Sequence, residues 1–190
     1  MAIVLASQSP RRQELLQRIG VEDFKTLSLD IDESYPEGLS PEDTVRYIAK
    51  KKCDAAAALC SPDDLIITAD TMVFLGNDRL GKPRDEEDAL RMLRALSGRG
   101  HTVCTGVSVR RGAQEERFAV STRVFFRPMT DDEIRAYIKT GEPMDKAGAY
   151  GVQSRGALFV ERIDGDFFNV MGLPVEQLGL VLARFGVKLL

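Results

Sequence analysis

A short apolar run in the middle of the chain places the strongest limit on the possible folds. Residues 64–69 (DLIITA) are rich in isoleucine, and a continuous run of this length is typical of a central strand covered on both faces. Residues 2–6 (AIVLA) form a similar run and are followed at once by turn and helix signals. This order of strand, turn and helix predicts an α/β architecture.

Helix signals recur along the whole chain. Ser9 and Pro10 begin the first helical pattern, which continues through Leu15, Leu16 and Ile19 and stops at the next residue, a glycine. The same Ser-Pro start precedes a second helix, and a Thr-Asp-Asp-Glu capping box precedes a later one. We expect helices over residues 10–19, 41–59, 86–96, 131–139 and 174–184.

The remaining segments complete a mixed sheet. Residues 72–75 resume as strand, and residues 101–109 and 116–126 alternate as two antiparallel neighbours joined at Arg111-Gly112. The glycine-rich residues 141–173 are expected to contain two more strands. Residues 1–190 therefore form one α/β domain, in which a mixed twisted sheet carries helices on its faces and a cleft lies between two unequal lobes.

Composition excludes several classes of function. The net charge of −3 is spread along the sequence, so the chain lacks the basic stripe that nucleic acid requires. The apolar runs are short and no basic-then-apolar leader opens the sequence, so we expect a cytoplasmic protein that does not span a membrane. Three cysteines without paired short spacing indicate reduced core residues. Because the chain has a single histidine, any metal must rest on oxygen ligands.

Two arginines stand where a helix normally favours acids. Arg11 and Arg12 lie in the first turn of the first helix, where exposed N–H groups already carry partial positive charge. The mismatch costs roughly 0.3–1 kcal/mol per charge unless an anion offsets it. Backbone N–H groups and arginine forks together suit a triphosphate. The alternative is that both arginines are simply solvated at the start of the helix.

Asp70 follows the central apolar run directly. In open α/β sheets, ligands bind at the carboxyl ends of strands, and Thr71 would line the same place. A carboxylate there could hold a divalent ion or accept a proton from an attacking water. An aspartate that caps a turn is the alternative.

Residues 76–83 (GNDRLGKP) nearly match a phosphate-binding loop, but the pattern fails at its last position. Pro83 replaces the Ser or Thr that would hold magnesium, so we reject a P-loop. Lys82 remains a cation fixed between glycine and proline. Within the run Lys50–Lys52, Lys52 lies closest to the apolar stripe of its helix.

The glycine-rich residues 141–153 could wrap closely around a ligand. Gln153 offers both a donor and an acceptor, which is what reading a nucleobase edge requires. Asp145 and Lys146 could simply pair with each other. An ordinary structural loop is the alternative.

Six short segments, in order and spread over the whole chain, together resemble the Maf family of nucleotide pyrophosphatases. They are residues 5–12 (LASQSPRR), 69–71 (ADT), 81–83 (GKP), 105–107 (TGV), 145–153 (DKAGAYGVQ) and 172–174 (GLP). The resemblance implies a mixed α/β fold with a deep cleft, shared with the inosine-triphosphate pyrophosphatases, and a homodimer. It also implies a house-cleaning hydrolase that cuts nucleoside triphosphates between the α and β phosphates, using magnesium, manganese or cobalt.

Residue roles follow from the same resemblance. Asp70 would accept the proton of the attacking water, and Glu33 would join Asp70 near the metal. The phosphates would be bound by Ser7, Arg11, Arg12, Lys52 and Lys82. Positions associated with a preference for dTTP and UTP are matched by Arg11, Thr71 and Gln153. Mild departures occur at Gln8, Cys53, Ser154 and Arg155, of which Arg155 could alter the choice of base.

Two other functions stay open on the sequence alone. Related proteins prefer 7-methyl-GTP, so hydrolysis of that or another modified nucleotide is one alternative. The other is a nucleotide-sensing regulator of cell division with little turnover. A turnover far below about 0.1 per second would favour the regulator, since enzymes typically reach about 10 per second.

Overall fold

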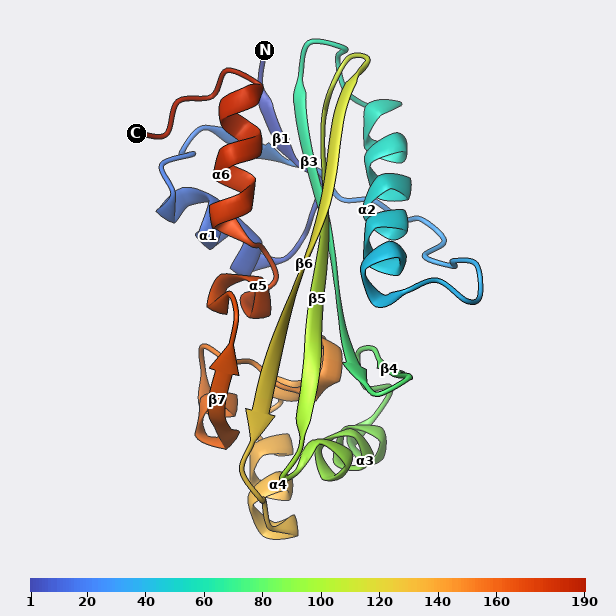
Figure 1. Cartoon of the computed structure of the whole chain (residues 1–190), viewed down its shortest axis with the longest axis vertical. Coiled ribbons are helices and arrows are strands. Elements are labelled where there is room, and N and C mark those ends of the chain that lie inside the picture. Colours follow the sequence, from blue (N-terminus) through green and yellow to red (C-terminus); the bar gives the residue numbers. More distant parts are fainter. The chain divides into compact units, whose positions relative to one another are not determined.

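Seven strands form a mixed sheet in the computed structural model, which describes residues 1–190 (Figure 1). The strands are β1 (Ile3–Leu5), β2 (Phe24–Thr26), β3 (Leu65–Leu75), β4 (Asp78–Leu80), β5 (Gly100–Arg111), β6 (Gln114–Phe126) and β7 (Val160–Asp164). Their order is β2-β1-β3-β5-β6-β7, and β4 pairs with β3. The pairs β1/β2 and β1/β3 are parallel, whereas β3/β4 and β6/β7 are antiparallel. The predicted α/β class with a mixed sheet is confirmed.

All five predicted helices are present, and each ends within two residues of its predicted end. The six helices are α1 (Pro10–Arg18), α2 (Pro41–Ala57), α3 (Glu86–Leu96), α4 (Asp131–Ile138), α5 (Phe167–Met171) and α6 (Val175–Arg184). Local signals explain the starts: the Ser40 hydroxyl accepts from Asp43 N, and Thr130 and Glu133 form the predicted capping box. Ser9 stands at the start of α1 but makes no side-chain cap, contrary to expectation.

The chain divides into two compact units. Unit 1 contains Met1–Asp70, Thr105–Val120 and Gly172–Leu190, and unit 2 contains Thr71–Cys104 and Ser121–Met171. The prediction of one domain with two lobes around a cleft stays a prediction.

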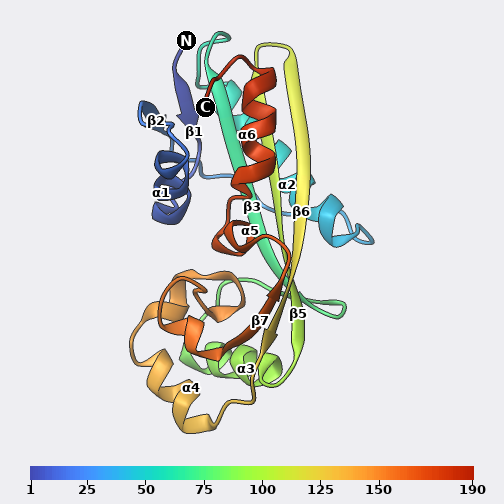
Figure 2. The same ribbon diagram turned by 60° about the vertical axis from the view of Figure 1, so that its left-hand side comes forward.

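Unit 1 is built on the parallel strands β2, β1 and the first half of β3. Figures 1 and 2 show α2 on one side of these strands and α1 and α6 on the other. The Thr68 hydroxyl joins the layers by donating to Ala49 O of α2 at 2.7 Å. Gly106 of β5 lies so close to α2 that a Cβ there would meet Val45 backbone atoms at 2.3 Å. Only glycine permits this approach.

Unit 2 packs α3 and α4 together with three 3₁₀ turns and a cluster of aromatic rings. The turns are η1 (Glu142–Asp145), η2 (Ala147–Ala149) and η3 (Arg155–Phe159). The buried Phe126 ring meets His101 edge-on at 4.9 Å and Tyr150 at 4.7 Å between centroids. The His101 imidazole Nε2 lies 2.7 Å from the Tyr150 hydroxyl, and its Nδ1 has no partner. Burial lowers the His101 pKa from 6.5 to about 4.

Two predicted details are wrong. β3 is one continuous strand from Leu65 to Leu75, so Asp70 lies inside a strand and not at its exit. β1 pairs with β3 only as far as Ile67, so Asp70 still lies beyond the carboxyl end of β1. Residues 141–173 contain one strand, β7, and not two, because short 3₁₀ turns occupy most of the segment. The short strands β2 and β4 and the short helix α5 were not predicted.

The buried histidine makes a prediction about stability and pH. His101 is the only histidine in the chain, and its pKa is about 4 when folded against 6.5 ordinarily. Between these values the unfolded chain binds a proton that the folded chain excludes. The free energy of unfolding should therefore fall on acidification, by up to about 1.4 kcal/mol per pH unit from this group. Urea titrations at pH 6.5 and 5 measure the slope.

The matched control is His101→Gln, which keeps a hydrogen-bonding group but removes the titration. Its stability should change less between pH 6.5 and 5 than that of the wild type. Equal slopes for the two proteins would show that His101 does not titrate as described.

Candidate functional site

The first turn of α1 carries the predicted arginine pair without any acidic residue. Pro10 occupies the first position of the helix, and the Ser9 side chain makes no capping hydrogen bond. Arg11 and Arg12 therefore add positive charge to the positive end of the helix. This arrangement suits an anion, as the sequence indicated.

Arg12 is also a structural residue, because its half-buried guanidinium joins three parts of unit 1. Its Nε donates to Gly172 O at 2.8 Å, and its Nη1 donates to Ala69 O at 2.9 Å and to the Ser7 hydroxyl at 3.3 Å. Desolvation lowers the Arg12 pKa from its ordinary value, and the nearby Asp70 carboxylate opposes this shift. The Ser7 hydroxyl and Arg12, both predicted phosphate ligands, are thus in contact.

Lys52 joins the two predicted metal ligands. Its ammonium group lies 2.7 Å from the Asp70 carboxylate and 2.8 Å from that of Glu33. Asp70 is buried, with 9% of its side chain exposed, whereas Glu33 is 56% exposed. Of the three consecutive lysines, Lys52 is the one that points into the site, as the apolar stripe predicted.

The two neighbouring lysines make ion pairs around the triad formed by Lys52, Glu33 and Asp70. Lys51 binds Asp32 at 3.2 Å and the carbonyl of Ser34 at 3.3 Å, which ties the segment around Glu33 to α2. Hydrogen bonds from Ser34 and then Lys51 lower the Asp32 pKa to about 2. Lys50 pairs with Asp54 one turn along the helix at 2.5 Å.

The donor set fits a hard divalent cation. Asp70 Oδ2 is buried and has no hydrogen-bond partner, although its other oxygen binds Lys52. A buried carboxylate oxygen without a partner is costly unless a cation or donor completes it. No three or more acidic, histidine or cysteine side chains are grouped so that they could hold a metal ion. Two carboxylates are nevertheless sufficient for magnesium, which is usually held by one or two together with substrate phosphates and water.

The other predicted site residues belong to unit 2. The half-buried Thr71 follows Asp70 within β3, and Lys82 is exposed just after β4. The carbonyl of Gly81 accepts a hydrogen bond from Gly148 N at 3.0 Å, so the Lys82 loop contacts the glycine-rich segment. A Cβ at Gly148 would meet Val73 side-chain atoms at 2.8 Å, which explains the glycine. Gln153 is exposed in the same segment.

Side-chain patterns in the sequence did not reveal every group that holds the predicted site residues in place. Arg12 is held by the carbonyl oxygens of Ala69 and Gly172, and main-chain groups leave no residue-type signal. Glu142 was noticed only as part of a glycine-rich run, yet its carboxylate accepts four hydrogen bonds.

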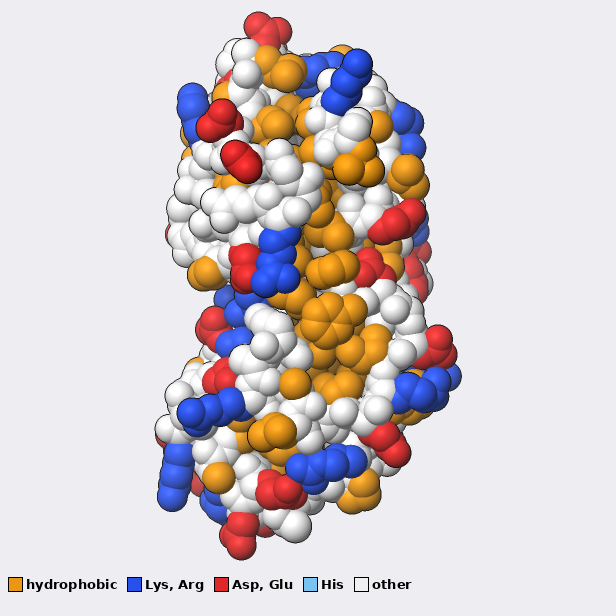
Figure 3. Space-filling view, turned by 90° about the vertical axis from the view of Figure 1, so that its left-hand side faces the viewer, with side chains coloured by type: hydrophobic (Ala, Val, Ile, Leu, Met, Phe, Trp, Pro, Cys, Tyr) orange, Lys and Arg blue, Asp and Glu red, His pale blue; other side chains and the backbone are white.

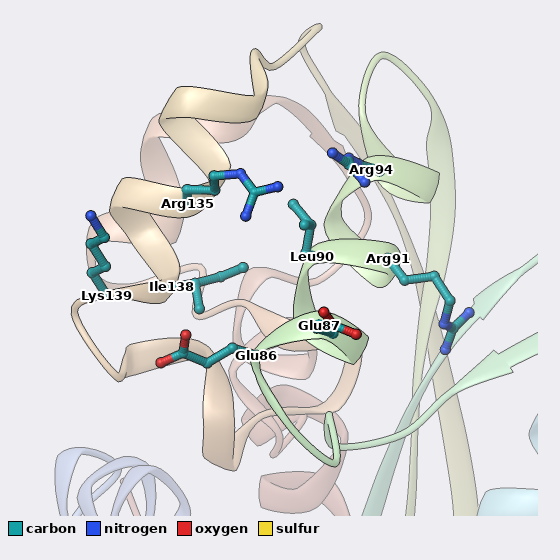
Figure 4. Close-up of a pocket in the computed structure, with 8 residues that line it drawn as sticks. All are labelled: Glu86, Glu87, Leu90, Arg91, Arg94, Arg135, Ile138 and Lys139. Carbon is teal, nitrogen blue, oxygen red and sulfur yellow. The ribbon is translucent and has the colours of Figure 1, made fainter.

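A pocket of about 650 Å³ lies elsewhere in unit 2, between α3 and α4, and contains none of the predicted site residues. It is lined by Glu86, Glu87, Leu90, Arg91, Arg94, Arg135, Ile138 and Lys139. In Figure 4, Arg135 and Ile138 point toward Leu90. Two of its arginines are already neutralised, Arg91 by Asp88 at 2.7 Å and Arg94 by Asp131.

The surface shows how the charges are distributed. On the face drawn in Figure 3, basic and acidic side chains are interspersed. No helix is both long and apolar enough to cross a membrane.

The model of one protein family, described as "Maf-like protein", matches residues 2–185. The chain belongs to the Maf family. A dTTP/UTP pyrophosphatase of Bacillus velezensis is 47% identical over 186 residues, which cover 98% of this chain and 97% of the relative. A dTTP/UTP pyrophosphatase of Pelotomaculum thermopropionicum is 46% identical over 190 residues, covering 99% and 98%. The predicted family is thereby confirmed.

Solved structures support the fold of this Maf protein. The Staphylococcus aureus Ham1 protein matches with a TM-score of 0.55 at 14% identity, covering 97% of this chain and 100% of that chain. A HAM1 protein from Coxiella burnetii matches with a TM-score of 0.54, also at 14% identity, covering 97% and 99%. At this identity the likeness concerns the fold alone.

The contacts of Arg12 predict its contribution to stability. Arg12→Ala would leave the buried carbonyls of Ala69 and Gly172 without their donor, and each such loss costs about 1–3 kcal/mol. We expect the free energy of unfolding in urea to fall by roughly 2–4 kcal/mol.

The matched control for Arg12 is Arg18→Ala in the same helix. Arg18 pairs only with the exposed Glu14, so its loss should cost about 0.5 kcal/mol or less. Similar losses in the two variants would contradict the structural role of Arg12.

Proposed function

We propose that this Maf protein hydrolyses nucleoside triphosphates, preferentially dTTP and UTP, to the monophosphate and pyrophosphate. The observation that carries the proposal is the Lys52 ammonium between Glu33 and the buried Asp70, whose second oxygen has no partner. Full-length relatives at 46–47% identity are named dTTP/UTP pyrophosphatases.

The residues of unit 1 supply the charges that this reaction needs. Cleavage between the α and β phosphates gathers negative charge on the leaving pyrophosphate, so fixed cations stabilise the transition state more than the ground state. Arg11 and Arg12 at the start of α1, and Lys52 on α2, are such cations. Lys82 is proposed to add a further cation from unit 2, and the Ser7 hydroxyl a hydrogen bond.

Asp70 is the proposed base. Its unpaired Oδ2 is an acceptor for a proton of the attacking water, while Lys52 holds Oδ1 and fixes the orientation of the carboxylate. Glu33 and Asp70 would hold a divalent cation such as magnesium, manganese or cobalt, which would neutralise phosphate charge and activate water.

Base preference is assigned to Arg11, Thr71 and Gln153. Their side chains offer hydrogen-bond donors, and the hydroxyl and the amide add acceptors, which suits a pyrimidine edge with both kinds of group. A homodimer and a cytoplasmic location complete the proposal, and light scattering of the purified chain tests the dimer.

A substrate panel tests the reaction. Hydrolysis of dTTP, UTP, CTP, GTP and 7-methyl-GTP is followed with magnesium or manganese, and pyrophosphate is scored separately from orthophosphate. We expect pyrophosphate release led by dTTP and UTP. Pyrophosphate release that is fastest with 7-methyl-GTP would show that the chain prefers this nucleotide over dTTP and UTP. Orthophosphate release, or no turnover with any base, would overturn the proposal and favour a nucleotide sensor.

Asp70→Asn tests the assignment of the base. The amide keeps the size of the side chain but cannot take the proton, so kcat should fall by roughly 10²–10⁴-fold while nucleotide still binds. Asp63→Asn is the control, because Asp63 is an exposed carboxylate outside the site. Near-normal turnover of Asp70→Asn would show that another group accepts the proton.

A further inference from the structure

A single carboxylate organises the loop that carries Gln153. Glu142 Oε1 accepts hydrogen bonds from the Tyr137 hydroxyl at 2.8 Å, the Ser154 hydroxyl at 2.6 Å and Gly156 N at 3.1 Å. Its Oε2 accepts from Arg155 N at 3.3 Å. Three of the four donors come from consecutive residues directly after Gln153. The carboxylate therefore fixes the chain on one side of that glutamine.

Tyr137 fixes the chain on the other side. Its hydroxyl donates to Glu142 and accepts from Gly151 N at 3.1 Å, two residues before Gln153. The ring is buried, with 4% exposed, and meets Phe159 edge-on at 5.1 Å. Tyr137 projects from α4, a regular helix with a complete capping box, so the anchor itself is rigid.

The loop is closed as tightly as its backbone allows. A Cβ at Gly156 would lie 2.5 Å from Gly151 O, and a Cβ at Gly151 would lie 2.8 Å from Lys146 Cε. Gly151, Val152 and Gly156 are buried, whereas residues 153–155 are exposed. The loop thus has a buried base and an exposed tip, and Gln153 begins the tip.

The charge of Glu142 is maintained by these contacts. Burial alone would raise its pKa, but the hydrogen bonds from Ser154, Tyr137 and the amides of Gly156 and Arg155 outweigh burial and the pKa is lowered. Bonds to an ionised acceptor are roughly twice as strong as neutral ones, so the loop is held by charge-assisted bonds.

We propose that Glu142 and Tyr137 are positioning residues for base selection, holding the 151–156 loop so that the Gln153 amide meets the pyrimidine in one orientation. This inference rests on the proposed function. Thymine and uracil present an acceptor at O4 where cytosine presents an N4 donor. A glutamine amide can pair with either pattern after a half turn. Discrimination therefore depends on where the loop places the amide, and a small displacement is sufficient to lose it.

The test compares kcat and KM for dTTP, UTP and CTP among variants of the full chain. Glu142→Ala removes all four bonds, Glu142→Gln keeps a neutral acceptor, and Tyr137→Phe removes the hydroxyl alone. We expect Glu142→Ala to reduce the kcat/KM preference for dTTP over CTP by roughly 10–100-fold, mainly through KM. Glu142→Gln and Tyr137→Phe should show smaller losses in the same direction. Glu161→Gln, an exposed carboxylate on β7 outside the loop, is the control.

A double variant separates positioning from general damage to the fold. If Glu142 acts through Gln153, Glu142→Gln should cause no further loss of preference in a Gln153→Ala background. Additive losses, or an unchanged preference in both Glu142→Gln and Tyr137→Phe, would overturn the inference. A wild-type enzyme that releases no pyrophosphate, or shows no preference among pyrimidines, would instead overturn the proposed function, so the two failures are distinct.

Discussion

The guanidinium of Arg12 is the interaction on which the arrangement of unit 1 depends. It joins the start of α1 to the Ala69 carbonyl of β3 and to the Gly172 carbonyl that precedes α6, and it also binds Ser7. A lysine could not replace it, because an ammonium lacks the planar fork that reaches separate acceptors in fixed directions. The same group that holds the strand beside Asp70 also places positive charge next to that carboxylate. Structure and electrostatics are therefore not independent at this site.

Lys52, Glu33 and Asp70 also depend on one another, because the lysine is paired with both carboxylates. Asp70 is buried, and a buried carboxylate is unfavourable unless it is paired. Lys52 supplies the pair from α2, and Lys51 fastens the segment that carries Glu33 to the same helix. One oxygen of Asp70 stays without a partner, which is a cost to folding that a purely structural aspartate has no reason to carry. This asymmetry distinguishes the site from an ordinary surface ion pair.

Much of the fold followed from local signals, whereas contacts across the chain did not. The Ser40-Pro41 start and the Thr130 capping box act within one turn, so the sequence predicted α2 and α4 closely. The break predicted at Asp70 failed because one polar residue does not end a strand that becomes buried again at residues 73–75. Three-residue β2 carries too few residues for a periodic signal. The phosphate and metal residues were predicted from a resemblance. Among them, Ser7 contacts Arg12, and Lys52 contacts Glu33 and Asp70.

The residues proposed for the reaction are divided between the two units. The proposed base, both metal ligands and most phosphate ligands belong to unit 1, whereas Thr71, Lys82 and Gln153 belong to unit 2. In the proposed reaction, rate depends on charge placed against the phosphates, whereas base choice is proposed to depend on the loop that Glu142 and Tyr137 hold. The four hydrogen bonds of Glu142 all come from residues of unit 2, so the proposal assigns base choice to contacts that differ from those of the proposed base. Arg155 is exposed in that loop and its main-chain N–H donates to Glu142, so under the proposal its side chain can face the base while other residues contact the carboxylates of unit 1.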